Sequence, residues 1–440
     1  MGPGRPPRPP PMSNPVVRGL ALPITPGAVL REPLGHGAVA LIREKHANPA
    51  VTILGYLRAG AMHDPEGREG LGLFTASMLT RGTAAYTSQG LALVLDSLGA
   101  SLSVRGDLEG VAVSARCLAE DVEQILGLAA EVILRPVFPP EEIEKQRGRI
   151  ITGIREGRLD TRTAAEKAFR EVTYPPRHPH HRTPEGEEAS IAAVTRDDLV
   201  AFHRRYYRPD GFAVAVVGDV VPPGILERLR TLWDGWRPVA AVEAVVPPPV
   251  RPASSVQRKA VAIPGKAQAD IVLGVPGFSR LSPDFYSAMM ADLILGRLGL
   301  MGRLGASVRD EEGLAYYVYS QAQAGFLAGP WAVHAGVSPR NVERAVEGIV
   351  REIRGLQREP VRGGELRDAQ DYLVGSLAVR LETDAGIAQA LLEIELFDLG
   401  LDYLLRYPAL IRGITPEAIG SAASRYFNLD GYSVATAVPA

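Results

Sequence analysis

Alternating apolar and polar positions predict strands at several places along the chain. Two early ones, Ala38–Arg43 and Val51–Arg58, are close enough in sequence to form a hairpin-like pair. Longer stretches between strands have apolar residues three and four positions apart, near Ala119–Leu134 and Pro140–Glu156, as amphipathic helices do. Because strands and helices interleave, the pattern predicts an α+β fold in which each mixed, mostly antiparallel sheet carries helices on one face.

The chain repeats itself in a single register. The segment Arg205–Phe212, RYYRPDGF, recurs as Arg425–Tyr432, RYFNLDGY, an offset of 220 residues as from Gly211 to Gly431. Each copy ends in a predicted strand, Gly211–Val217 or Gly431–Val438. The same offset relates three further pairs: Thr195 and Thr415, Val111–Val113 and Trp331–Val333, and Val122–Glu123 and Val342–Glu343. The duplication predicts two homologous domains.

Local composition marks the boundaries of these domains. Residues 1–25 are rich in Pro, Gly and Arg and are expected to form a disordered tail, within which Met12 is an alternative start. Residues 238–256 include Pro247–Pro249 and have little to bury, so they are expected to form a semi-extended linker. The predicted domains are therefore residues 26–237 and 257–440.

Overall composition excludes several classes of protein. Of 440 residues, 46% are apolar and the net charge is −2, which is typical of a globular protein and argues against a nucleic-acid partner. Cys117 is the only cysteine, so neither an intrachain disulfide nor a cysteine-rich metal site can form. Because the sequence has no signal-peptide core and no stretch of membrane-spanning length, the chain is expected to be cytoplasmic, without a membrane partner.

One segment resembles the zinc-binding region of a known peptidase family. Residues Asp64–Thr83 read DPEGREGLGLFTASMLTRGT, which is similar to the pitrilysin/insulinase pattern G-[IL]-A-H-x-x-E-H-M-L-x-x-G-T. In that family the two histidines bind zinc and the glutamate activates the metal-bound water. Leu73, Ala76 and Ser77 hold these three positions here.

The family's remaining zinc ligand is missing as well. It lies on a later helix, in a segment similar to Glu144–Ile154, and the two usual acidic positions fall on Thr152 and Gly153. A catalytic zinc needs about three protein ligands, and this frame supplies none. The resemblance therefore implies a processing-peptidase-like subunit that lacks the zinc motif, with no metal and no cofactor in this chain. The vacated positions are read as ordinary core positions of an amphipathic helix.

A second signature of the family is intact. Residues Leu300–Val318 contain the pattern R-x-x-x-G-L-x-Y, with Arg309 and Tyr316 at its ends. In the family this pair reaches across the central cavity and donates hydrogen bonds to substrate or to the developing oxyanion. The resemblance implies that Arg309 and Tyr316 bind substrate. The plainer alternative is that Arg309 pairs with Asp310–Glu312 on a surface turn and Tyr316 begins a buried strand.

The histidines give weaker signals. His178–His181, HPHH, is the only dense cluster, but its proline prevents the regular spacing that brings metal ligands together. Adventitious metal binding is the preferred interpretation there. Scattered single histidines such as His63 are interpreted as satisfied surface or core residues.

Three functions remain open at this point. The preferred hypothesis is a non-catalytic subunit that pairs with a homologous zinc-bearing chain, the two clamshell halves enclosing a peptide substrate that Arg309 and Tyr316 contact in trans. The alternatives are a non-enzymatic scaffold or peptide-binding module of the same fold, and a peptidase that uses displaced ligands such as His63 or His178. The sequence leaves open whether the isolated chain forms a homodimer.

Overall fold

The computed structural model describes residues 25–239, 242, 245–250 and 253–440. The predicted tail therefore lies outside the described residues except for Thr25, and the predicted linker is described only in part. The first copy of the repeat contains the following elements: η2 Pro26–Ala28, β1 Leu30–Gly35, β2 Ala38–Glu44, β3 Ala50–Leu57, η3 Ala61–His63, α1 Leu71–Met78, α2 Ser88–Ser97, β4 Ser101–Gly106, β5 Val111–Leu118, η4 Ala119–Asp121, α3 Val122–Leu134, α4 Pro140–Arg158, α5 Thr161–Thr173, η5 Pro179–His181, α6 Glu188–Ala193, α7 Arg196–Tyr206, β6 Ala213–Gly218 and α8 Pro222–Trp233.

The second copy follows nearly the same order. Its elements are β7 Gln257–Ile263, β8 Ala269–Pro276, α9 Phe285–Gly296, α10 Gly302–Leu304, η6 Gly305–Glu311, β9 Ala315–Ala322, β10 Pro330–Val337, η7 Pro339–Asn341, α11 Val342–Arg358, α12 Gly363–Arg380, α13 Asp384–Leu396, α14 Tyr403–Arg412, α15 Pro416–Tyr426 and β11 Ser433–Pro439.

The two sheets share one strand order, which confirms the α+β prediction. The first runs β1-β2-β6-β3-β5-β4 and the second β7-β11-β8-β10-β9, so that only β1 lacks a counterpart. Strand β2 pairs in parallel with β6, and β7 in parallel with β11, while the other pairs are antiparallel. Each sheet is therefore mixed and mostly antiparallel.

The predicted hairpin-like pairing of the first two strands is wrong. The closing strand β6 lies between β2 and β3 and forms hydrogen bonds with both. Every residue of β6 is buried, so its apolar sequence, AVAVVG, favours a central position over an edge. The turn before it needs Gly211 at φ 86°, a conformation that glycine adopts without strain.

Helix boundaries preserve the sequence repeat. Helices α3 and α11 begin at Val122 and Val342, at the 220-residue offset. Before α7 and α15, the hydroxyls of Thr195 and Thr415 each accept a hydrogen bond from the backbone N–H three residues later. This N-cap satisfies a donor that the helix itself cannot. The repeated threonine is therefore explained by the same local requirement in both copies.

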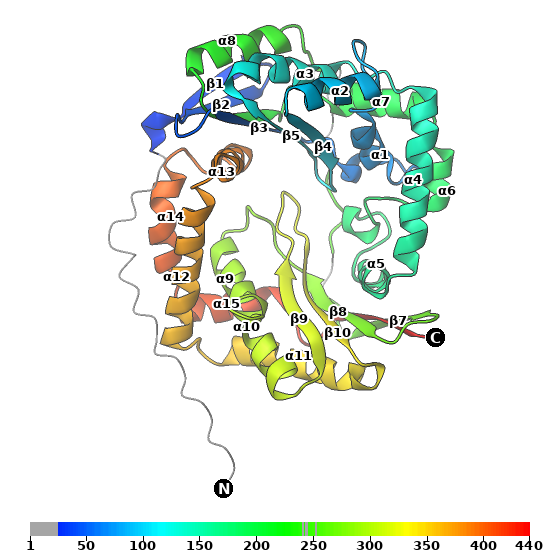
Figure 1. Cartoon of the computed structure of the whole chain (residues 1–440). Helices are drawn as coiled ribbons and strands as arrows, with labels where there is room; N and C mark the ends of the chain where they lie inside the picture. The colour runs from blue at the N-terminus through cyan, green and yellow to red at the C-terminus, as the bar shows by residue number, and fades with distance from the viewer. Residues whose placement is uncertain (1–24, 240–241, 243–244, 251–252) are drawn as a thin grey trace.

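Each sheet is covered on its outer face by helices of its own copy and on its inner face by a helix of the other copy. Figure 1 shows α3 and α8 outside the first sheet, with α13 of the second copy against its inner face. Helix α13 buries apolar side chains such as Ile387 and Leu391 against Leu41 and Ala215. In exchange, α5 of the first copy packs Phe169 on the second sheet. The prediction that helices cover one face of each sheet is confirmed. The exchanged helix covers the other face as well.

Polar contacts anchor both ends of α13 and the start of α5. Lys45 forms an ion pair of 2.7 Å with Asp384 at the start of α13, and Arg31 forms one of 2.7 Å with Glu395 near its end. At the start of α5, the Thr161 hydroxyl donates to buried Asp270 of the second sheet. These contacts fix where each exchanged helix lies on the opposite sheet.

The exchange predicts a large cost for Phe169→Ala. Phe169 is fully buried between α5 and the second sheet, so truncation should lower the free energy of unfolding by about 3–5 kcal/mol. Chemical denaturation at equilibrium measures this. Leu159→Ala, at a side chain that is 59% exposed, is the control and should change stability by less than about 0.5 kcal/mol. Equal effects of the two changes would contradict a stabilising exchange.

Candidate functional site

Helix α1 carries the three vacated zinc-motif positions, and Asp64 fixes where it begins. The Asp64 carboxylate is buried and accepts hydrogen bonds of 2.7 Å from the backbone N–H groups of Gly70 and Gly72. Gly70 has φ 92°, and a Cβ there would lie 2.5 Å from the carbonyl oxygen of Glu185. The entry to α1 therefore has little freedom to shift.

The first turns of α1 present Leu73 and Ser77 to one pocket and bury Ala76. The pocket has a volume of about 330 Å³. The Ser77 hydroxyl donates to the Phe74 carbonyl at 2.7 Å, so it is engaged by its own helix. Ala76 is 1% exposed, and its Cβ lies 3.1 Å from the place where Gly106 would carry a Cβ. A longer side chain at position 76 would press on strand β4.

The donor set at this position does not fit zinc. Thr152 and Gly153, which hold the family's acidic positions, are exposed on α4 and do not line the pocket, where Ile150 is found instead. Among the residues that the structure describes, no cluster of three or more His, Cys, Asp or Glu side chains could hold a metal ion. Leu73 and Ser77 come together as the frame predicts, but they enclose apolar space.

Arg309 and Tyr316 lie at the other candidate site, on η6 and at the start of the edge strand β9. Arg309 is on a π-helical turn, a feature that often marks functional sites. Its Nη1 lies 3.8 Å from the Asp310 carboxylate and has no hydrogen-bond partner. Tyr316 is 81% exposed, so it does not begin its strand as a buried residue. Within the described chain no hydrogen bond or cation–π contact joins the pair. The Tyr316 side chain is open to another molecule, whereas the Nη1 atom of Arg309 is buried beside Asp310.

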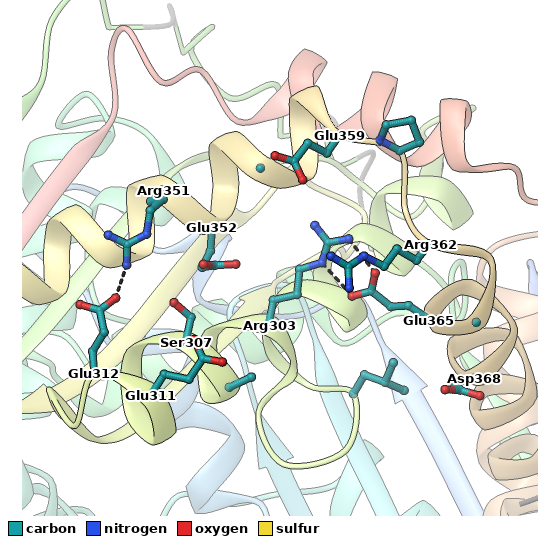
Figure 2. Close-up of a pocket in the computed structure, with 15 residues that line it drawn as sticks. Arg303, Ser307, Glu311, Glu312, Arg351, Glu352, Glu359, Arg362, Glu365 and Asp368 are labelled. Carbon is teal, nitrogen blue, oxygen red and sulfur yellow. Dashed lines mark hydrogen bonds and ion pairs between the residues drawn. The ribbon is translucent and has the colours of Figure 1, made fainter. Parts of the chain in front are cut away.

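A large charged groove is lined in part by η6, the helix that carries Arg309. Figure 2 shows its lining, which comes from α10, η6, α11 and α12, with two ion pairs across it. Arg303 donates two hydrogen bonds to Glu365, at 2.7 and 2.6 Å, and Arg351 pairs with Glu312. The groove has a volume of about 1040 Å³. Sequence reasoning missed it because its charges come from two stretches far apart in the chain, 303–312 and 351–368.

A smaller cavity of about 430 Å³ lies between the two copies. Arg280, only 6% exposed, donates to the Tyr403 hydroxyl at 3.1 Å and to Glu393 at 3.3 Å. Its guanidinium stands 4.1 Å from the centroid of the Phe285 ring. The arginine is thus held by aromatic and acidic partners and forms part of the wall of the cavity. No local sequence pattern pointed to it.

Equivalent hairpins of the two copies meet beside this cavity. The Glu109 carboxylate, in the β4–β5 turn, accepts hydrogen bonds from the backbone N–H groups of Phe326 and Leu327, at 2.9 and 2.7 Å, in the β9–β10 loop. Arg58 covers the Phe326 ring at 4.0 Å. A Cβ at Gly325 would lie 2.2 Å from a Glu109 oxygen, so glycine is required for this approach.

The histidine cluster does not form a metal site in the described structure. His178 and His180 are each 4% exposed, and both rings pack against Tyr174. Burial lowers the pKa of His178 to about 4 and that of His180 to about 3, so both are neutral near pH 7. The imidazoles therefore act as packing groups there.

Comparison with known proteins places this geometry in a family. The model of the insulinase family (peptidase family M16) matches residues 39–175, and the model described as the peptidase M16 inactive domain matches residues 193–373. The chain belongs to the M16 peptidase family. It is a member in which neither zinc-binding histidine is present.

Several M16 relatives resemble the chain over most of its length. It is 22% identical to an uncharacterized zinc protease of Streptomyces coelicolor, over 84% of this chain and 80% of that relative. It is 24% identical to a non-peptidase homolog of Helicobacter pylori, over 83% and 84% of the two chains. The names of these relatives thus include both uncharacterized zinc protease and non-peptidase homolog, so family membership alone does not decide the activity.

Solved M16 structures share the fold. A peptidase M16 inactive domain from Pseudomonas fluorescens superposes with a TM-score of 0.86 at 24% identity, covering 94% of this chain and 98% of that one. A protease from Helicobacter pylori gives a TM-score of 0.87 at 17% identity, with coverage of 93% and 99%. The two-domain clamshell architecture is therefore the fold of this M16 chain. None of the helices in the described part is both long and apolar enough to cross a bilayer.

The donor set predicts that this M16 chain carries no bound zinc. Protein purified without chelators should contain far less than one zinc per chain by plasma mass spectrometry, because Leu73 and Ala76 offer no ligand atoms. Chelator should leave the melting temperature unchanged. One equivalent of zinc, together with a lower melting temperature after chelation, would contradict this account of the pocket.

Asp64 predicts a specific dependence of stability on pH. Burial raises the pKa of Asp64 from an ordinary 3.8 to about 7, against the opposing effect of its two backbone hydrogen bonds. Because the folded carboxyl keeps its proton to higher pH than the unfolded one, the free energy of unfolding should fall as pH rises from about 4 through about 7. The stability of Asp64→Asn relative to wild type should therefore rise over that range.

Denaturant titrations at several pH values measure this difference. Glu66→Gln, an exposed carboxylate in the same loop, is the control and should follow the wild-type curve. A relative stability of Asp64→Asn that stays constant or falls with pH would show that the hydrogen bonds to Gly70 and Gly72 dominate and that the carboxylate is ionised throughout.

Proposed function

We propose that this chain is a non-catalytic subunit of a zinc-dependent peptidase. It pairs with a homologous chain that carries the zinc motif, and the two together enclose a peptide. The observation that carries the proposal is an asymmetry between its two sites. Leu73, Ala76 and Ser77 leave the zinc position without ligands, while Arg309 and Tyr316 are retained and the Tyr316 side chain is exposed.

The chemistry of the retained pair supports a role in substrate binding. A guanidinium is a permanent hydrogen-bond donor and a phenol hydroxyl is a donor at neutral pH. Donors placed in advance around a peptide carbonyl stabilise the negative charge that develops on its oxygen during hydrolysis. In this proposal Arg309 and Tyr316 supply those donors in trans. The peptide lies extended against a sheet edge of the zinc-bearing partner.

A reducing compartment suits this chain. Its single cysteine, Cys117, is buried, and burial raises the pKa of its thiol to about 11, so it is unreactive as a nucleophile near pH 7. With no disulfide to form, the fold depends on packing and on polar contacts. We therefore include the cytoplasm in the proposal.

A second candidate function is a scaffold or peptide-binding module without any part in catalysis. The Helicobacter pylori relative named a non-peptidase homolog favours it. The two functions differ in what they require of Arg309 and Tyr316. A scaffold tolerates replacement of both, whereas a subunit that acts in trans does not.

Reconstitution distinguishes the two. The partner is first identified by co-purification from the native cell, as a chain that carries H-x-x-E-H, and the two purified chains are then mixed. The mixture should hydrolyse peptides that neither chain cleaves alone. Arg309→Ala or Tyr316→Phe should reduce kcat by about 10²–10³, the usual cost of a lost oxyanion donor.

Tyr372→Phe, at an exposed tyrosine on α12, is the matched control and should leave the activity of the mixture unchanged. A mixture whose kcat is insensitive to Arg309→Ala would remove the role in trans. Stable pairing with that insensitivity would favour the scaffold.

A further inference from the structure

The vacated zinc position is a preformed apolar pocket. Its walls are Leu73 and Phe74 of α1, Val104 of β4 and Ile150 of α4. The volume of about 330 Å³ lies at the lower end of the range of about 300–1,000 Å³ that is usual for small-molecule sites. Asp64 fixes α1 on one side of it, as described above. The pocket therefore does not need to be created by a ligand.

Two charges of opposite sign also line this pocket. Arg105 belongs to β4 and Glu185 lies in the loop before α6, and both residues are exposed. In the part of the chain that the structure describes, neither side chain takes part in a hydrogen bond or an ion pair. The other polar group, the Ser77 hydroxyl, is already bound to the Phe74 carbonyl. The free charges of the site are thus one cation and one anion beside apolar walls.

We propose that this pocket binds a small zwitterion with an apolar side chain, namely an apolar amino acid or dipeptide. The ligand carboxylate pairs with the Arg105 guanidinium, which suits planar bidentate recognition of a carboxylate. Its ammonium group pairs with Glu185, and its side chain fills the space between Leu73 and Ile150. Removal of the side chain from water supplies the remaining affinity. The site is independent of the proposed pairing and of Arg309 and Tyr316.

Calorimetric titration of the whole chain tests this. Leucine and leucyl-leucine are the probes, and the stronger of the two identifies which length the site takes. Glycine lacks the side chain, N-acetylleucine lacks the ammonium charge, and leucinamide lacks the carboxylate. Each of the three should bind at least about tenfold more weakly than leucine, because each loses one of the three recognition elements.

Variants test the assigned residues. Arg105→Gln and Glu185→Gln should each weaken leucine binding by about tenfold or more, and Ser77→Phe, which fills the pocket, should abolish it. Arg116→Gln, at an exposed arginine on the neighbouring strand β5, is the matched control and should bind like wild type. Circular dichroism and the melting temperature show that each variant is folded.

Several results would overturn the proposal. The absence of heat and of any ligand-induced rise in melting temperature with millimolar leucine and leucyl-leucine would remove the site. Binding of N-acetylleucine and leucinamide equal to that of leucine would remove the zwitterion. Binding unaffected by both Arg105→Gln and Ser77→Phe would place the ligand elsewhere on the chain. None of these results bears on the reconstitution of peptidase activity, so the two proposals fail separately.

Discussion

The reciprocal exchange of one helix is the interaction on which the rest of this structure depends. Each sheet has its own helices on the outer face, and the inner face would meet solvent if α5 and α13 did not cross over. Small side chains such as Ala165, Ala168 and Ala388 let the crossing helices approach the opposite sheet closely. Because each copy supplies part of the other's core, the two halves are held as one body.

The exchange also explains which strands are apolar on both faces. Strand β6, which α13 covers, is buried at every residue, whereas β5, farther from that helix, alternates between buried and exposed side chains. A sheet covered on both faces needs near-continuous apolar strands. In the first sheet the strand pattern therefore follows the position of the exchanged helix. The candidate sites lie by the edge strands β4 and β9.

The vacated zinc position shows how a metal site can be lost without damage to the fold. Asp64 still caps α1, and Ala76 fits against Gly106 where a longer side chain would press on the strand. Leu73 and Ile150 line the pocket at the position of the family's zinc site with apolar side chains. The helix therefore keeps its place through the hydrogen bonds of Asp64 to its first turn and through its packing, with no contribution from metal ligands.

Sequence periodicity and the internal repeat predicted much of this fold, because caps and apolar spacing act locally. The repeat required two related domains and paired Thr195 with Thr415, which the structure shows to be the N-caps of α7 and α15. The insertion of β6 between β2 and β3 could not be predicted, since it joins segments far apart in the chain. The same limit hid the pocket beside Leu73 and the cavity around Arg280, whose walls come from distant elements. Arg309 and Tyr316 were found only because one short segment contains both.

Native-state hydrogen exchange in the central strands β6 and β11 tests the exchange of helices most directly. If each copy completes the core of the other, amides of both strands should exchange through one global opening, with the same free energy and the same dependence on added denaturant. A lower opening free energy in one strand, while the other stays protected, would show that the copies unfold independently and would contradict the account.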